Sequence, residues 1–143
     1  MALIVQKYGG TSVGDIDKIR AVAKKVSTIV KAGNRVIVVV SAMSGETNRL
    51  VELAENFSDS KGWALDMLLS TGEQVTISLL SMALREIACS ATPLCGWQVP
   101  IKTDDSYGKA RIENIEIQKL VSLTESGVIP VVAGFQGVDD SGV

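Results

Sequence analysis

The aliphatic run from Arg35 to Ser41 is the feature that most restricts the fold of this chain. Its centre, Val36–Val40, contains only valine and isoleucine. A strand with one face in water alternates apolar and polar residues, whereas a strand covered by helices on both faces is continuously apolar. The run therefore predicts a buried strand of a parallel sheet with helices packed on both sides.

Helical and extended patterns alternate along the rest of the chain. From Ile16 the apolar residues recur at helical spacing as far as Val30, and Gly33 follows as an expected left-handed cap. The other expected strands are Ala2–Val5, Gln98–Thr103 and Val128–Ala133, and the other expected helices begin near Thr47, Ala64 and Glu116. This order predicts one α/β domain, a three-layer sandwich around a mainly parallel sheet.

Some details of these elements are also predicted. Ala2–Val5 is short and apolar, which suits a buried strand. The helix near Thr47 is expected to turn Leu50, Leu53, Ala54 and Phe57 inward. The long helical stretch from Ala64 to Ile87 is expected to be interrupted at Ser70–Gly72, because glycine disfavours a helix interior.

The segment Lys7-Tyr8-Gly9-Gly10-Thr11-Ser12 stands between the first strand and the first helix. A glycine pair lets the backbone turn tightly and approach a ligand without obstruction by Cβ. The N–H groups at a helix start favour an anion, most often phosphate, and Lys7 adds a positive charge. The spacing fits neither a Walker A motif nor a dinucleotide fingerprint. In a strand-to-helix turn, a glycine pair is structural about as often as functional, but the lysine and hydroxyls favour a phosphate site.

Turns rich in glycine, serine and threonine also follow the other two best strands. They are Ser41–Gly45 and Gly134–Gly137. Ligands of parallel sheets gather beyond the carboxyl ends of the strands. We therefore expect the three turns to form one site.

Composition excludes several classes of function. The formal net charge is −2 and no dense run of lysine and arginine is present, which argues against nucleic acid as a partner. The chain contains no histidine, so catalysis by Ser-His-Asp or Cys-His groups and zincin chemistry are excluded. Cys89 and Cys95 lack the spacing of a metal site, and we expect both to be reduced and structural.

The same composition favours a cytoplasmic protein. No basic segment precedes the first apolar run, so a signal peptide is not expected. Val36–Val40 is far shorter than the roughly 20 residues of a membrane span, and we expect no membrane association.

Simpler interpretations of the candidate residues remain open from the residues alone. Lys7 could be an exposed lysine at a strand end, and Thr47 could be only a helix N-cap. Glu73 would ordinarily be a solvated glutamate, and Ser41 at a strand end is weak evidence by itself.

Five ordered motifs nevertheless resemble the aspartokinases of the amino acid kinase family. They are Lys7–Gly14 (KYGGTSVG), Val39–Asn48 (VVSAMSGETN), Leu68–Gln74 (LLSTGEQ), Gly96–Val99 (GWQV) and Val132–Val138 (VAGFQGV). Kinases of the family that act on glutamate, acetylglutamate or UMP share the lysine and glycines, but are not expected to share all five motifs.

The resemblance implies phosphoryl transfer from MgATP to the β-carboxylate of L-aspartate, giving 4-aspartyl phosphate. This is the first step of the branch leading to lysine, threonine and methionine. A carboxylate is already ionised at pH 7, so the reaction needs positioning and charge neutralisation more than a base. The absence of histidine agrees with this chemistry.

The family pattern also assigns roles to individual residues. Lys7 would neutralise the charge on the transferred phosphoryl group, and the phosphates of ATP would lie against Lys7, Tyr8, Gly9, Gly10, Thr11 and Ser12. Aspartate would contact Ser41, Thr47, Glu73, Gly134 and Phe135, with Glu73 on its α-amino group. Mg²⁺ would be held through the nucleotide phosphates, without protein ligands.

One departure from the family limits this expectation. In the family, the loop at Asp139–Gly142 leads into a Gly-Arg-Gly-Gly-Ser-Asp segment and the nucleotide-base half of the kinase. We therefore expect residues 1–143 to be the N-terminal portion of a catalytic domain that is inactive alone and binds ATP weakly. An exposed sheet edge is expected to cause self-association or pairing with the missing half. The alternative is a non-catalytic anion-binding or assembly module, which would not need both Lys7 and Glu73.

Overall fold

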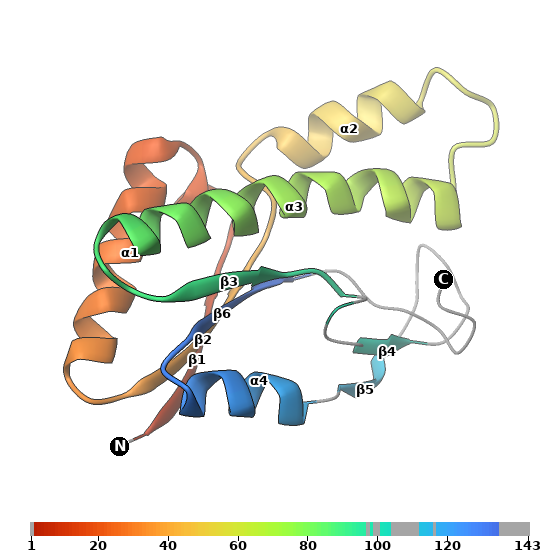
Figure 1. The fold of residues 1–143 in the computed structure, drawn as a ribbon. Coiled ribbons are helices and arrows are strands. Elements are labelled where there is room, and N and C mark those ends of the chain that lie inside the picture. The colour runs from red at the N-terminus through yellow and green to blue at the C-terminus, as the bar shows by residue number, and fades with distance from the viewer. Residues whose placement is uncertain (1, 97, 99–100, 104–111, 116, 135–143) are drawn as a thin grey trace.

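Three layers build the protein, as Figure 1 shows. The computed structural model describes residues 2–96, 98, 101–103, 112–115 and 117–134. The strands are β1 (Leu3–Tyr8), β2 (Arg35–Val40), β3 (Ala91–Leu94), β4 (Ile101–Thr103), β5 (Ile112–Ile115) and β6 (Ile129–Ala133). The helices are the 3₁₀ helix η1 (Gly10–Val13), α1 (Ile16–Lys31), α2 (Glu46–Ala54), α3 (Trp63–Glu86) and α4 (Ile117–Glu125).

The central sheet has four parallel strands in the order β1-β2-β6-β3, and β4 and β5 form a separate antiparallel pair. Tyr8 is in register with Val40, and Val40 with Ala133, so these strands end at one level. The predicted α/β class and mainly parallel sheet are confirmed. The level ends bring the turns that follow β1, β2 and β6 to one edge.

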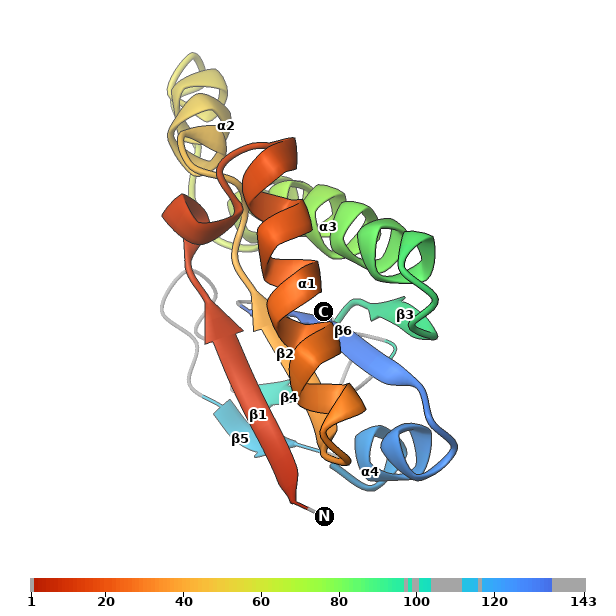
Figure 2. The same cartoon turned by 90° about the vertical axis from the view of Figure 1, so that its left-hand side faces the viewer.

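Helices cover both faces of the sheet. On one face α1 and α3 enclose the larger core, which includes Val38, Val131, Leu80 and Leu84. On the other face α4 packs over β2 and β6, where Leu120 contacts the cluster of Ile37, Leu94 and Val132. Figure 2 shows α1 lying across the sheet on the side opposite α4. The continuous aliphatic runs of β2 and β6 are explained by this double cover.

Most of the predicted helix boundaries are confirmed. α1 begins after Asp15, whose side chain accepts a hydrogen bond from the Lys18 N–H at 2.8 Å. Gly33 has the predicted left-handed conformation with φ of +96°, and Gly127 ends α4 with φ of +84°. Cys89 and Cys95, predicted to be reduced and structural, are free thiols and both are buried.

The prediction that the first strand is buried is wrong. β1 lies at an edge of the sheet, and its residues alternate between exposed and half-buried. Val5 is 59% exposed, because α4 covers β2 and β6 but not β1. An apolar sequence alone does not reveal how far the covering helix extends.

Two predictions about the helices are also wrong. α3 continues without interruption through Ser70–Gly72 for 24 residues. In α2, Leu50 is buried and Ala54 half-buried, but Leu53 is 49% exposed. Phe57 lies beyond the end of α2 and is 71% exposed. α2 contacts α3 rather than the sheet, so only a narrow stripe of its surface is covered.

α3 is long and apolar enough to cross a membrane when judged by length and composition alone. The core helix of a soluble protein passes the same test. Thr76, Ile77, Leu80 and Leu84 of α3 are buried, and the last three belong to the core on the sheet. Packing against the sheet explains the high apolar content of this helix.

The C-terminus of α3 provides a test of stability. Ala88 adopts φ of +64°, while its N–H donates to Arg85 O and the Cys89 N–H donates to Leu84 O. These bonds form a Schellman motif, in which this position is usually glycine because a Cβ is strained there. We expect Ala88→Gly to raise the free energy of unfolding by about 0.5–1 kcal/mol in urea denaturation.

Gly127 provides the matched control for this change. It occupies the same position after α4, with bonds from Gly127 N–H to Thr124 O and from Val128 N–H to Leu123 O. Gly127→Ala should lower the free energy of unfolding by a similar amount. An unchanged midpoint in both variants would contradict the assignment of strain to this position.

Candidate functional site

The turn after β1 is built on close backbone contact rather than on unusual backbone angles. Gly9 is extended, with φ of −81°, and its N-terminal neighbour is the last residue of β1. A Cβ built on Gly10 would lie 3.0 Å from the Ala42 carbonyl oxygen and 3.4 Å from the Ser44 nitrogen. A Cβ on Gly9 would meet no atom within 4 Å. Gly10 therefore serves packing, whereas the space beside Gly9 is open.

The helix that follows this turn does not offer its first N–H groups in the predicted way. η1 comes first, with the Ser12 N–H donating to Gly9 O at 3.1 Å, and α1 begins only at Ile16. The Asp15 carboxylate caps α1 and supplies a negative charge at that helix start. An anion is therefore favoured beside Gly9–Ser12 but not at the start of α1.

Hydrogen bonds join the turns after β1, β2 and β6. The Ser41 N–H donates to Tyr8 O at 3.3 Å, and the Gly134 N–H donates to Val40 O at 2.9 Å. The Ser44 N–H donates to Gly10 O at 3.1 Å. The structure thus brings the predicted segments Gly9–Ser12, Ser41–Gly45 and Gly134 to one edge of the sheet.

Gly134 also permits a close contact. A Cβ on Gly134 would lie 3.1 Å from the Val40 carbonyl oxygen, so a side chain would disturb the bond between these residues. Phe135, the other residue predicted for this part of the site, lies outside the described residues.

Lys7 and Tyr8 project to opposite faces of the sheet. Tyr8 packs against the core under α1 and α3, its hydroxyl donates to Gln6 Oε1 at 2.6 Å, and burial raises the pKa of the phenol. Lys7 is exposed and is in register with Val39, on the face that carries α4. Tyr8 therefore has a packing role, while Lys7 is exposed on the other face near the end of the strand.

Glu73 reaches the site from α3. It is only 4% exposed, in contrast to the solvated glutamate that its sequence context alone would suggest. It lies on the same face of α3 as Thr76, Ile77 and Leu80, and directly follows Gly72, which contacts Ala42 just beyond the end of β2. Burial, and to a lesser extent the neighbouring Glu73 carboxylate, raises the pKa of the Cys95 thiol just beyond β3. Glu73 therefore places a carboxylate in a protected position beside the ends of the strands.

Thr47 lies in the first turn of α2 and is exposed. It is not the N-cap, because Gly45 occupies that position with φ of +82°. Beside it the Arg49 guanidinium donates to Glu46 Oε1 at 3.1 Å, which lowers the pKa of the Glu46 carboxyl. The Thr47 hydroxyl is left at the protein surface near the turn that carries Ser41.

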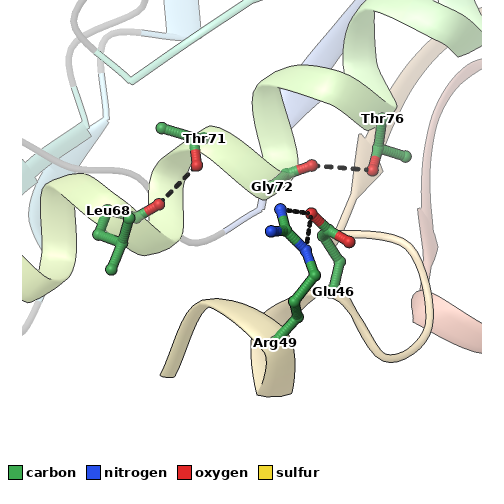
Figure 3. Close-up of polar contacts among 6 residues, drawn as sticks. All are labelled: Glu46, Arg49, Leu68, Thr71, Gly72 and Thr76. Carbon is green, nitrogen blue, oxygen red and sulfur yellow. Dashed lines mark hydrogen bonds and ion pairs between the residues drawn. The ribbon is translucent and has the colours of Figure 1, made fainter. Parts of the chain in front are cut away.

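Gly72 is the residue that sequence reasoning missed. A Cβ on Gly72 would lie 3.0 Å from the Ala42 Cβ, and 3.4 Å from Glu46 Cγ and Leu50 Cδ1. Figure 3 shows Gly72 on α3 opposite the start of α2, where Glu46 and Arg49 lie. The available signal was a glycine inside an otherwise regular helical pattern, which usually has a packing reason.

A cavity of about 580 Å³ lies at the opposite edge of the sheet, between the C-terminus of α3 and the start of β3. Its lining includes Arg85, Ser90, Thr92 and Leu123. None of the predicted site residues within the described part of the chain lines it. The Arg85 Nε–H donates to Ala91 O at 3.1 Å, which holds part of this guanidinium in a structural contact.

Sequence comparison identifies close relatives of this chain. Aspartate kinase from Pseudomonas putida is 54% identical over 143 residues, which are 99% of this chain and 35% of that protein. The aspartokinase of Bacillus sp. strain MGA3 is 52% identical with the same coverage. The chain thus spans about a third of the length of these relatives.

Solved structures agree with this similarity. The crystal structure of aspartate kinase from Synechocystis matches 94% of this chain and 22% of that chain, with a TM-score of 0.80 and 47% identity. E. coli aspartokinase III in complex with aspartate and ADP matches 99% of this chain and 42% of that chain, with a TM-score of 0.79. At 24% identity, the second match demonstrates a common fold.

The family assignment itself depends on a match across almost the whole chain. The sequence pattern of the amino acid kinase family matches residues 2–143. The described fold agrees with that of aspartate kinases in sheet and helices. This chain belongs to the amino acid kinase family.

Proposed function

We propose that this chain forms the phosphate-binding and amino-acid-binding part of an ATP-dependent aspartate kinase, and that residues 1–143 are the N-terminal portion of its catalytic domain. The observation that supports this most strongly is the meeting of Gly9–Ser12, the turn at Ser41–Gly45 and α3 at one sheet edge. The chain is similar over nearly its whole length to aspartate kinases, and E. coli aspartokinase III was captured with aspartate and ADP.

In this proposal the phosphates of ATP lie against the open side of Gly9. The Thr11 N–H and the hydroxyls of Thr11 and Ser12 would bind phosphate oxygens. Lys7, exposed at the same edge, would neutralise charge on the transferred phosphoryl group. No three carboxylate or thiol groups gather as a metal site in the described part of the chain, and we propose that Mg²⁺ is held through the phosphates.

Aspartate would lie on the α3 side of the same edge. The protected Glu73 carboxylate is suited to the α-amino group of the substrate, since a charge-assisted bond is stronger away from water. The hydroxyls of Ser41 and Thr47 would bind carboxylate oxygens, and Gly134 with Phe135 would form the wall of the pocket. The β-carboxylate then attacks the γ-phosphorus, the bond from that phosphorus to the ADP oxygen breaks, and ADP leaves.

We further propose a cytoplasmic protein that associates through its exposed β1 edge, either with a second copy or with the remainder of the catalytic domain. The 36% and 59% exposure of Leu3 and Val5 supports this proposal, since exposed apolar strand edges favour pairing.

Two variants, each replacing one of the neighbouring glycines by alanine, test the phosphate site. Gly9→Ala should leave thermal unfolding unchanged, because φ of −81° suits alanine and the space is open. It should weaken ATP binding at least about 10-fold in calorimetry, because the methyl group would occupy the space proposed for phosphate. Gly10→Ala should instead destabilise the fold by about 1–3 kcal/mol, because it overpacks the contact with Ala42. ATP affinity equal to wild type in Gly9→Ala would contradict the proposed cradle.

Lys7 provides a test based on charge. Lys7→Ala should weaken MgATP binding about 10- to 100-fold, as expected for the loss of a charge-assisted contact. Lys24→Ala, which removes an exposed lysine from α1, is the matched control and should bind MgATP normally. Equal losses in the two variants would indicate a general effect of net charge.

Glu73 provides a separate test on the amino-acid side. Glu73→Gln keeps the size of the side chain, removes its charge, and should weaken aspartate binding at least about 10-fold while leaving ATP affinity unchanged. Glu52→Gln, at an exposed position of α2, is the control. Aspartate titrations of the two variants that coincide would remove Glu73 from the proposed pocket.

A further inference from the structure

The contact between Gly72 and the turn after β2 fixes where α3 crosses the proposed site. A Cβ on Gly72 would lie 3.0 Å from the Ala42 Cβ. This separation is too short, because carbon atoms in contact prefer about 3.5–4.0 Å. A methyl group on Gly72 would therefore push α3 away from this turn by about 0.5–1.0 Å. The neighbours of Gly72 on the other side, Glu46 and Leu50, belong to α2 and leave no room for it to move sideways.

The regularity of α3 excludes a hinge as the reason for this glycine. The helix is continuous, and the Thr76 hydroxyl donates to the Gly72 carbonyl oxygen at 3.3 Å within it (Figure 3). Glycine weakens a helix relative to alanine, so alanine would be more stable at this position unless the packing requires that no Cβ be present. Gly72 is also buried, which leaves the close approach to Ala42 and α2 as its physical role.

Gly72 directly precedes Glu73, and Ala42 directly follows Ser41. The contact between Gly72 and Ala42 therefore joins the two sides of the proposed aspartate pocket through one pair of neighbouring residues. An amino acid would be held by the Glu73 carboxylate at one end and by the Ser41 and Thr47 hydroxyls at the other. A change in the spacing between these groups would therefore weaken its binding.

We propose that Gly72 is a positioning residue, which sets the separation between Glu73 and the Ser41–Thr47 segment so that the pocket fits an amino acid of the size of aspartate. This inference rests on the proposed function for its substrate, but the steric contact on which it depends stands by itself. The proposal predicts that the methyl group added at position 72 can be compensated by removing the methyl group at position 42.

The test compares Gly72→Ala, Ala42→Gly and the double variant by aspartate titration and by amide hydrogen exchange of residues 41–47. Gly72→Ala should weaken aspartate binding at least about 10-fold and speed exchange in this segment. The double variant should bind aspartate within about 3-fold of wild type and recover slow exchange. Thr71→Ala changes the adjacent exposed residue of α3, whose hydroxyl donates to Leu68 O within the helix, and should match wild type in both measurements.

The outcomes separate this proposal from the proposed function. Gly72→Ala that binds aspartate normally, or a double variant as impaired as Gly72→Ala, overturns the positioning role. If the wild-type chain does not bind aspartate but exchange follows the expected order, the proposed function fails for residues 1–143 by themselves and the steric coupling is supported. If Gly72→Ala leaves exchange of residues 41–47 unchanged, the coupling itself is overturned.

Discussion

The turn from Ser41 to Ser44 is packed directly against the backbone of three other segments, and the rest of the site depends on this packing. Gly10 and Gly72 lack the side chains that would stand between that turn and η1 or α3, and Gly134 lacks the side chain that would stand between the end of β6 and Val40 at the end of β2. None of these three glycines has a positive φ, so each is needed for space and not for backbone freedom. Side chains that belong to distant parts of the sequence can approach one ligand because the backbones that carry them are in contact.

Much of the framework could be predicted from local sequence. β2 and β6 are continuously apolar because helices cover both of their faces, and α1 carries a clear helical stripe from Ile19 to Val26. Gly33 and Gly127 could be recognised as helix ends because helices commonly end with a glycine in the left-handed conformation, which depends only on the neighbouring residues. The edge of the sheet at which the site lies also followed from the order of strands and helices.

What local sequence could not supply was the identity of each segment's neighbours. β1 is apolar but is left uncovered by α4, and Leu53 lies on a part of α2 that α3 does not cover. Phe57 lies beyond the end of α2 and is exposed. A glycine within a helical sequence pattern looks the same whether it interrupts the helix or lets a second segment pack closely against it, as Gly72 does. The burial of Glu73 depends on the sheet beneath α3, and the Asp15 cap moves the favoured anion position from the start of α1 to Gly9–Ser12.

The opposite orientations of Lys7 and Glu73 have a geometric consequence for the proposed reaction. Lys7 belongs to the sheet face that carries α4, whereas Glu73 descends from α3 on the other face. In-line phosphoryl transfer requires the attacking and leaving oxygens to stand on opposite sides of phosphorus. In the proposed site, the Lys7 ammonium and the Glu73 carboxylate would reach the reactants from opposite faces of the sheet, and the phosphoryl group and the α-amino group of aspartate would be held from different sides.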